Sequence, residues 1–172
     1  MQFVVGDITA QDTEAVVNAA NSRLAPGGGV AGAIHRAAGP LLWEESSTIG
    51  GCATGEAKVS KGYNLPNRFV IHTVGPVYSG SKEDPALLMS CYVNSLKVAD
   101  ANGIKSVSFP ALSTGIFGYP LSEAADVAVK AFSDYLSGDT GLELVRMVIY
   151  DNAAYEAHLK ALDQLEESGG MG

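Results

Sequence analysis

A chain of 172 residues, 47% of them hydrophobic and 17% charged, is long enough to bury a core and is typical of one globular domain. Its formal net charge of −8 argues against tight nonspecific binding to nucleic acid, which needs clustered lysines and arginines. No apolar run reaches transmembrane length, so no membrane role is expected. Without a signal peptide or a cysteine framework, Cys52 and Cys91 are expected to be buried thiols of a cytoplasmic protein.

Short apolar runs alternate with helical patterns along the chain. Strands are predicted at residues 2–5, 15–17, 68–74, 106–112 and 144–150, and residues 54–59 are predicted to form a turn that leads into a short strand. Helices are predicted from residue 31 onward with a continuation over 40–47, and at residues 84–102, 122–136 and 155–165. This alternation predicts an α/β sandwich around a mixed, largely parallel sheet. We assign residues 1–165 to a single domain and residues 166–172 to a flexible C-terminal tail.

Residues 18–39 are the most informative stretch of the sequence. The strand that ends at Val17 is followed by Asn18 and Asn21, then by three consecutive glycines at residues 27–29, the first glycine loop, and a helix begins at once. Glycines let a ligand approach the backbone closely, and a helix start offers unpaired N–H groups with the positive end of the helix dipole. The stretch therefore predicts a phosphate or diphosphate site.

Other strand ends carry residues suited to the same ligand. In a parallel sheet these ends lie at one edge, where α/β proteins bind ligands. Residues 113–118 form a second glycine loop that could clamp a diphosphate against the first. Tyr150 offers a face for stacking on a base, and Asn21 offers donors and an acceptor for sugar hydroxyls. The alternatives are that one loop is only a tight turn and that Tyr150 fills the core.

Two side chains near these strands have competing interpretations. Asp7, in the turn after the first strand, either accepts a hydrogen bond from a ligand or caps the short segment that follows. His72 lies within an apolar strand, where a histidine is more often a core residue than a catalytic one. We expect the structural role for both on the residues alone.

Several common enzyme motifs are incomplete. Gly27, Gly29 and Gly32 match the pattern G-x-G-x-x-G, but the acidic strand end that a dinucleotide fold needs does not follow. The phosphate loop of nucleotide triphosphatases and the Gly-x-Ser-x-Gly motif of hydrolases are both missing. The histidines and cysteines show no metal-ligand spacing, so we expect neither a metal nor a cofactor.

Five segments occur in an order that is typical of one family. They read Gly-Asp-Ile-Thr at residues 6–9, Val-Asn-Ala-Ala-Asn at 17–21, a glycine-rich stretch at 27–39, His-Thr-Val-Gly-Pro at 72–76 and Ser-Thr-Gly-Ile-Phe-Gly-Tyr-Pro at 113–120. This order resembles the macrodomain family, and most of all its MacroD-type branch, from about residue 3 to about residue 160. The resemblance implies a three-layer α/β/α sandwich that binds ADP-ribose.

The resemblance also implies roles for individual residues. Asp7 and the Ile8 backbone would recognise adenine, and Tyr150 would stack on it. The implied ligand-binding set is Asp7, Ile8, Ala20, Asn21, Gly27, Gly28, Gly29, Val30, Ser113, Thr114, Gly115, Ile116, Phe117, Tyr150 and Asp151. The implied catalytic set is Asn21, Gly28 and His35, where His35 either supports the site or is an ordinary partly buried helix residue.

The implied chemistry is ester hydrolysis. Many members release ADP-ribose from Asp or Glu side chains or remove acetate from O-acetyl-ADP-ribose, so ADP-ribosylated proteins and O-acetyl-ADP-ribose are the implied partners. MacroD-type members usually carry Asp where this chain has Ala31, and a carboxylate would help to activate water. Coronaviral macrodomains are similar to this chain in having alanine there, and they still hydrolyse such esters. Hydrolysis is therefore favoured; a non-catalytic ADP-ribose reader is the alternative, and an RNA binder is disfavoured by the charge.

Overall fold

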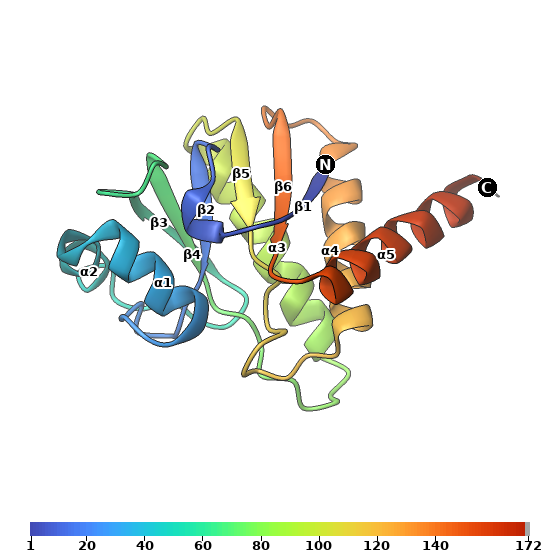
Figure 1. Ribbon diagram of the computed structural model, residues 1–172, viewed down its shortest axis with the longest axis horizontal. Helices are drawn as coiled ribbons and strands as arrows, with labels where there is room; N and C mark the ends of the chain where they lie inside the picture. Colours follow the sequence, from blue (N-terminus) through green and yellow to red (C-terminus); the bar gives the residue numbers. More distant parts are fainter. Residues whose placement is uncertain (171–172) are drawn as a thin grey trace.

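A six-stranded sheet in the order β1-β6-β5-β2-β4-β3 forms the centre of the protein (Figure 1). The computed structural model describes residues 1–170. The strands are β1 (Gln2–Val5), β2 (Ala15–Ala19), β3 (Ala57–Lys61), β4 (Phe69–Thr73), β5 (Ser106–Phe109) and β6 (Leu144–Ile149). All neighbouring pairs are parallel except β3 and β4, which are antiparallel. The predicted mixed, largely parallel sheet is confirmed.

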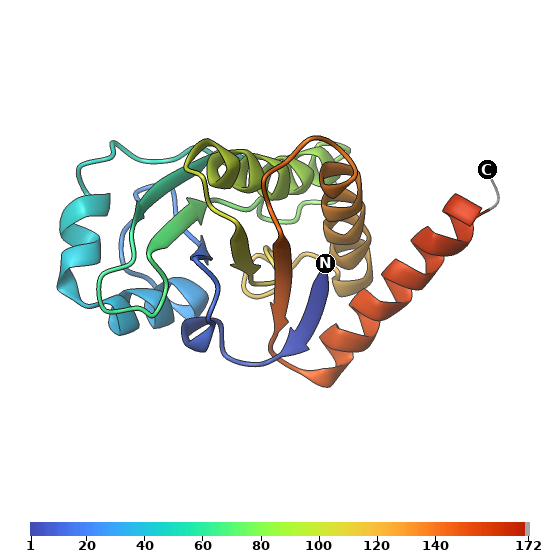
Figure 2. The same ribbon diagram turned by 90° about the horizontal axis from the view of Figure 1, so that it is seen from above.

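Helices cover both faces of the sheet (Figure 2). One face carries α1 (Gly29–Ala38) and α2 (Pro40–Ser46), and the other carries α3 (Asp84–Ala101) and α4 (Leu121–Leu136). The short 3₁₀ helix η1 (Ile8–Ala10) follows β1, and α5 (Asn152–Gly170) packs against α4 and the edge strand β1. The three-layer α/β/α sandwich is therefore confirmed. Among residues 1–170, no helix has the length and hydropathy needed to cross a membrane.

Neighbouring residues of β2 enter different hydrophobic cores. Val16 packs with Ile34 of α1 in one core, while Val17 packs with Phe109 of β5 in the larger core beneath α3 and α4. Successive side chains of a strand point to opposite faces, so a strand covered on both sides is apolar throughout. The strands could be predicted from the sequence for this reason. Cys52 and Cys91 are both free and buried, as expected.

Two helix predictions are wrong in their bounds. The helix expected to continue through residues 40–47 is interrupted at Gly39, whose φ of +85° is not helical, and Pro40 begins α2 instead. Proline suits the first turn of a helix because its missing N–H has no partner there. The C-terminal helix, predicted over residues 155–165, begins at Asn152 and continues to Gly170. Residues 166–170 of the predicted tail are thus helical, and residues 171–172 lie outside the described residues.

The chain leaves the neighbouring strands β2 and β5 toward opposite faces of the sheet. The segment after β2 leads to α1, and the segment after β5 leads to α4 on the other face. Open α/β sheets bind ligands at such a point, outside the carboxyl ends of the strands. These ends lie along the lower edge of the sheet in Figure 1. The topology therefore brings the starts of the two glycine loops to the position where such sheets bind ligands.

Candidate functional site

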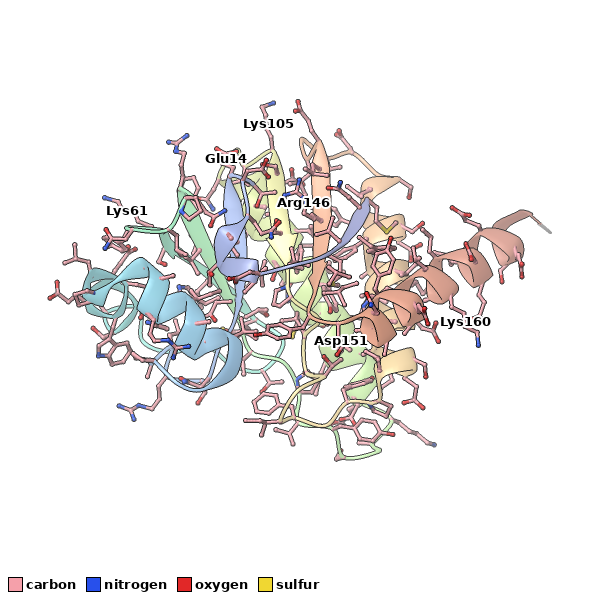
Figure 3. The ribbon with its side chains drawn as sticks, viewed as in Figure 1. Glu14, Lys61, Lys105, Arg146, Asp151 and Lys160 are labelled. Carbon is pink, nitrogen blue, oxygen red and sulfur yellow. The ribbon has the colours of Figure 1, made fainter. Side chains whose placement is uncertain are left out.

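Most of the predicted ligand residues share the edge formed by the carboxyl ends of the parallel strands. We call this region the strand-end site. Asp151, which follows β6, lies at this edge in Figure 3, whereas Glu14 and Lys105, which precede β2 and β5, lie at the opposite edge. The site comprises Asp7 and Ile8 after β1, Asn21 and Gly27 to Val30 after β2, Ser113 to Phe117 after β5, and Tyr150 after β6.

The first glycine loop runs directly into the N-terminus of α1. Gly28 is the N-cap residue and has no side chain to satisfy the helix start, and Gly29 has a φ of +55°, which residues with side chains rarely adopt. The first hydrogen bond of the helix runs from the Gly32 N–H to the Gly28 carbonyl (3.2 Å). The N–H groups of residues 29–31 come before it and therefore have no partner within the helix. An anion at this exposed loop would meet these N–H groups and the positive end of the helix dipole.

Asn21 shapes the turn that leads to the glycines. Its Oδ1 accepts hydrogen bonds from the backbone N–H groups of Arg23 (3.1 Å) and Ala25 (3.0 Å), and its Nδ2 donates to the Ala25 carbonyl (2.8 Å). The amide nitrogen also lies beside Gly27, 3.5 Å from the position that a Cβ atom would take there. The side-chain oxygen is therefore committed to the loop, and the second N–H of Nδ2 is the group that can reach a ligand.

The second glycine loop is a tight turn with a strained residue at its start. Ser113 has a φ of +66°, and its carbonyl accepts a hydrogen bond from the Tyr119 N–H (2.9 Å). Its Oγ is buried and has no hydrogen-bond partner within residues 1–170. A Cβ atom on Gly75 would collide with this oxygen, so the close approach needs glycine there. A buried hydroxyl without a partner is costly unless a ligand or water satisfies it.

Exposed apolar and aromatic groups border the second glycine loop and the end of β6. Ile116 is 94% exposed and Tyr150 is 88% exposed. The Phe117 carbonyl accepts a hydrogen bond from the Tyr78 N–H (2.8 Å), which fixes the loop to the segment after β4. The alternative that Tyr150 fills the core is wrong, because its ring is almost fully open to a ligand.

Asp7 acts as a helix cap, which was one of its two interpretations. Its Oδ1 accepts hydrogen bonds from the Thr9 N–H (2.9 Å) and the Thr9 hydroxyl (2.7 Å) at the start of η1. These hydrogen bonds hold the pKa of Asp7 below its usual value, so the carboxylate is ionised at neutral pH. The other carboxylate oxygen has no hydrogen bond to a described residue, and it can still accept one from a ligand amino group.

Three further predicted ligand residues also make hydrogen bonds within the protein itself. The Ala20 N–H donates to the Thr73 carbonyl (2.9 Å), and the Thr114 hydroxyl donates to the Ala111 carbonyl (2.9 Å). Asp151 accepts from the Ala154 N–H (2.8 Å) and thereby caps α5. Their contribution to a ligand site is therefore limited to the atoms that these bonds leave free.

His72 belongs to a buried polar network beneath α1. Its Nδ1 lies 3.1 Å from the Asn18 Nδ2 and its Nε2 lies 2.8 Å from the Ser60 Oγ. Burial, and to a smaller extent His35, lowers the pKa of His72 to about 3. His72 is thus a satisfied core residue, as expected. The partners were missed, although Asn18 and His72 occupy paired positions in neighbouring strands once the sheet order is known.

His35 lies on the buried face of α1, one helical turn after Ala31. It is 6% exposed, neither ring nitrogen has a hydrogen-bond partner, and its ring centroid is 6.5 Å from that of His72. Burial lowers the pKa of His35, so the ring is neutral at pH 7. Ala31 offers no carboxylate to orient it. Within residues 1–170, no group of three or more His, Cys, Asp or Glu side chains is placed to hold a metal ion.

Known proteins are similar to this chain in both sequence and fold. Residues 17–128 match the family model described as Macro domain. An O-acetyl-ADP-ribose deacetylase of Escherichia fergusonii is 48% identical, over 92% of this chain and 93% of that protein. An Oceanobacillus iheyensis macrodomain solved with ADP is 40% identical with a TM-score of 0.91, covering 96% of this chain and 91% of that one. A Trypanosoma brucei macrodomain in complex with ADP-ribose is 41% identical with a TM-score of 0.88, covering 93% and 68%. The chain therefore belongs to the Macro domain family.

Proposed function

We propose that this protein binds ADP-ribose at the strand-end site and hydrolyses esters of ADP-ribose with acetate or with acidic side chains of proteins. The observation that carries the proposal is the placement of two glycine loops after the neighbouring strands β2 and β5, one of them opening α1 with unpaired N–H groups. The names of the relatives support it, since one is a deacetylase of O-acetyl-ADP-ribose and another was solved with ADP-ribose.

The diphosphate would lie between the two glycine loops. In a chain with a net charge of −8, backbone N–H groups at a helix start are a suitable source of positive potential for an anion. The exposed ring of Tyr150 would stack on adenine, and the free oxygen of Asp7 would accept a hydrogen bond from the adenine amino group. The second N–H of Asn21 would face the distal ribose.

Hydrolysis would depend on a water molecule held in the strand-end site. Water adds to the ester, the bond between ADP-ribose and the acyl group breaks, and the products are ADP-ribose and a carboxylic acid. Ala31 supplies no base, so we assign the positioning of water to the N–H groups of the first glycine loop, to Asn21 and to the substrate phosphate. Positioning and fixed dipoles can lower a barrier substantially without a strong base.

The hydrolase proposal is tested by measuring release of ADP-ribose from O-acetyl-ADP-ribose and from a protein ADP-ribosylated on glutamate. We expect release by the native protein and little release by Asn21→Ala. Calorimetry with ADP-ribose on both proteins separates lost binding from lost chemistry, and thermal unfolding of Asn21→Ala shows whether its loop still folds. Release by the native protein that does not exceed the Asn21→Ala control would contradict hydrolysis.

A non-catalytic ADP-ribose reader is the second candidate function. Ala31 favours it, because a side chain that cannot act as a base stands at the first turn of the helix beside the site. Tight ADP-ribose binding without product after long incubation would establish this function instead.

A further inference from the structure

The chain between β4 and α3 runs beside the second glycine loop, at the edge of the sheet that holds the strand-end site (Figure 1). We call residues 74–83 the β4–α3 segment. The Tyr78 N–H donates to the Phe117 carbonyl (2.8 Å). The rings of Tyr78 and Tyr119 lie 5.1 Å apart at an interplanar angle of 58°. The position of the second glycine loop is therefore tied to the β4–α3 segment.

Asp84 holds the β4–α3 segment from the first turn of α3. Its Oδ2 accepts hydrogen bonds from the backbone N–H groups of Ser79 (2.9 Å) and Gly80 (3.0 Å), and the Ser79 hydroxyl lies 3.3 Å from each carboxylate oxygen. Ser79 and Gly80 directly follow Tyr78, the residue that is bonded to the second glycine loop. A continuous set of contacts thus leads from Asp84 to that loop.

The Asp84 carboxylate is buried without a cation. Its residue is 4% exposed and forms no ion pair within residues 1–170. Burial of a carboxylate is costly unless hydrogen bonds and positive potential compensate for it. The N–H groups of Ser79 and Gly80 supply the hydrogen bonds, and the N-terminus of α3 supplies the potential. The carboxylate is stable only while this turn stays folded over it, so α3 and the β4–α3 segment are held together.

We infer that Asp84 is a positioning residue for ADP-ribose binding, because it fixes the second glycine loop through the β4–α3 segment. The inference rests on the function proposed for the strand-end site, and Asp84 acts in it without contacting the ligand. The loop needs support from outside, since Ser113 at its start has a φ of +66° and such strained residues persist only when their surroundings hold them. Backbone donors bind a phosphate well only at the right distance and angle, so a displaced loop loses affinity.

Calorimetric titrations of full-length variants, well below the Tm of each, test this inference with ADP-ribose and with adenosine. Asp84→Ala removes both acceptor oxygens, and we expect it to weaken ADP-ribose binding by about tenfold or more. Adenosine has no phosphate for the second glycine loop to hold, so Asp84→Ala should bind adenosine as the native protein does. A merely structural role would not change the ratio of the two affinities.

Asp84→Asn is the conservative variant that should rescue binding. One amide oxygen can accept from both N–H groups that share Oδ2, so we expect ADP-ribose affinity within about threefold of the native value. Glu83→Ala is the matched control, because this adjacent acid is exposed and its side chain does not cap α3; its affinity should be native. Asp84→Ser is too short to hold both N–H groups and should show the same loss as Asp84→Ala, which it replaces if that variant does not fold.

Amide hydrogen exchange reports on the loop without any ligand. The N–H groups of Tyr78, Gly118 and Tyr119 are hydrogen-bonded at the second glycine loop or to it. They should exchange faster in Asp84→Ala than in the native protein, and at nearly native rates in Asp84→Asn and Glu83→Ala.

Three results would overturn the inference. They are native ADP-ribose affinity in Asp84→Ala, an equal loss of affinity for ADP-ribose and adenosine, and equal ADP-ribose affinity in Asp84→Asn and Asp84→Ala. Failure of the native protein to bind ADP-ribose would instead refute the proposed function. In that case the exchange rates still decide the role of Asp84, since unchanged exchange in Asp84→Ala would show that Asp84 does not hold the loop.

Discussion

Two adjacent residues at the end of β6 are expected to separate ligand affinity from stability. Tyr150 is 88% exposed, so its ring buries little surface in the free protein and is open to adenine. The Asp151 carboxylate accepts a hydrogen bond from the Ala154 N–H at 2.8 Å and caps α5. Tyr150→Ala should therefore act on ADP-ribose binding, whereas Asp151→Ala should act on the free energy of unfolding.

The size of each effect follows from these contacts. Stacking of a base on an aromatic ring is worth about 1–3 kcal/mol, so Tyr150→Ala should weaken ADP-ribose binding by roughly 5- to 150-fold. Its free energy of unfolding should change by less than about 0.5 kcal/mol, as for other exposed positions. Loss of the Asp151 cap should cost about 1 kcal/mol and lower the Tm by about 2–4 °C, with little change in affinity.

Calorimetry with ADP-ribose and thermal unfolding measure the two effects on the same variants. Tyr150→Phe keeps the aromatic face and should retain the native affinity, which makes it the control for the loss of the ring. Native affinity in Tyr150→Ala would refute the stacking role. An unchanged Tm in Asp151→Ala would refute the cap, and a large loss of affinity there would place its carboxylate in the ligand site instead.

Three further predictions concern packing, pH and the missing carboxylate. Gly32→Ala should lower both the Tm and the ADP-ribose affinity, because its Cβ would collide with the Gly27 carbonyl and displace the first glycine loop. Gly115→Ala is the control, because a Cβ atom at Gly115 would meet no other atom, and its Tm should stay near the native value. The free energy of unfolding should fall between about pH 7.5 and about pH 5.5, since the pKa of His72 is about 3 in the folded protein and roughly 6.5 when unfolded, so the unfolded chain binds the proton first. Protonation of His72 in the unfolded chain alone should lower the free energy of unfolding by about 1.4 kcal/mol over that interval. Urea titrations that give the same free energy of unfolding at both pH values would contradict this prediction. Ala31→Asp should speed release of ADP-ribose from its esters by about 100-fold if a base is what the site lacks, and an unchanged rate would show that positioning suffices.

Much of the fold could be predicted because its signals are local. A strand covered on both faces must be apolar throughout, and a run of glycines before a helix marks an anion site wherever it occurs. The topology of a parallel sheet then brings the strand ends to one edge. The order of the sheet could not be derived in this way, because it depends on which strands pair across long stretches of chain.

The side-chain roles depended on partners that the sequence does not place. The resemblance implied that Asn21 and Asp7 face a ligand, and the structure shows that each also makes hydrogen bonds to backbone groups of its own turn. His72 meets Asn18 and Ser60 only because β4 lies between β2 and β3. Nothing local distinguishes such a network from an isolated core histidine.

The sequence by itself determined the α/β class, the two glycine loops and the family, since each depends on short patterns of residue type. The tertiary structure decided which atoms remain free for a ligand. It left the Tyr150 ring exposed, committed the Asn21 oxygen to its loop, and interrupted the helix at Gly39. The physical reason is that burial and hydrogen bonding depend on contacts between residues far apart in the chain, which residue patterns alone do not specify.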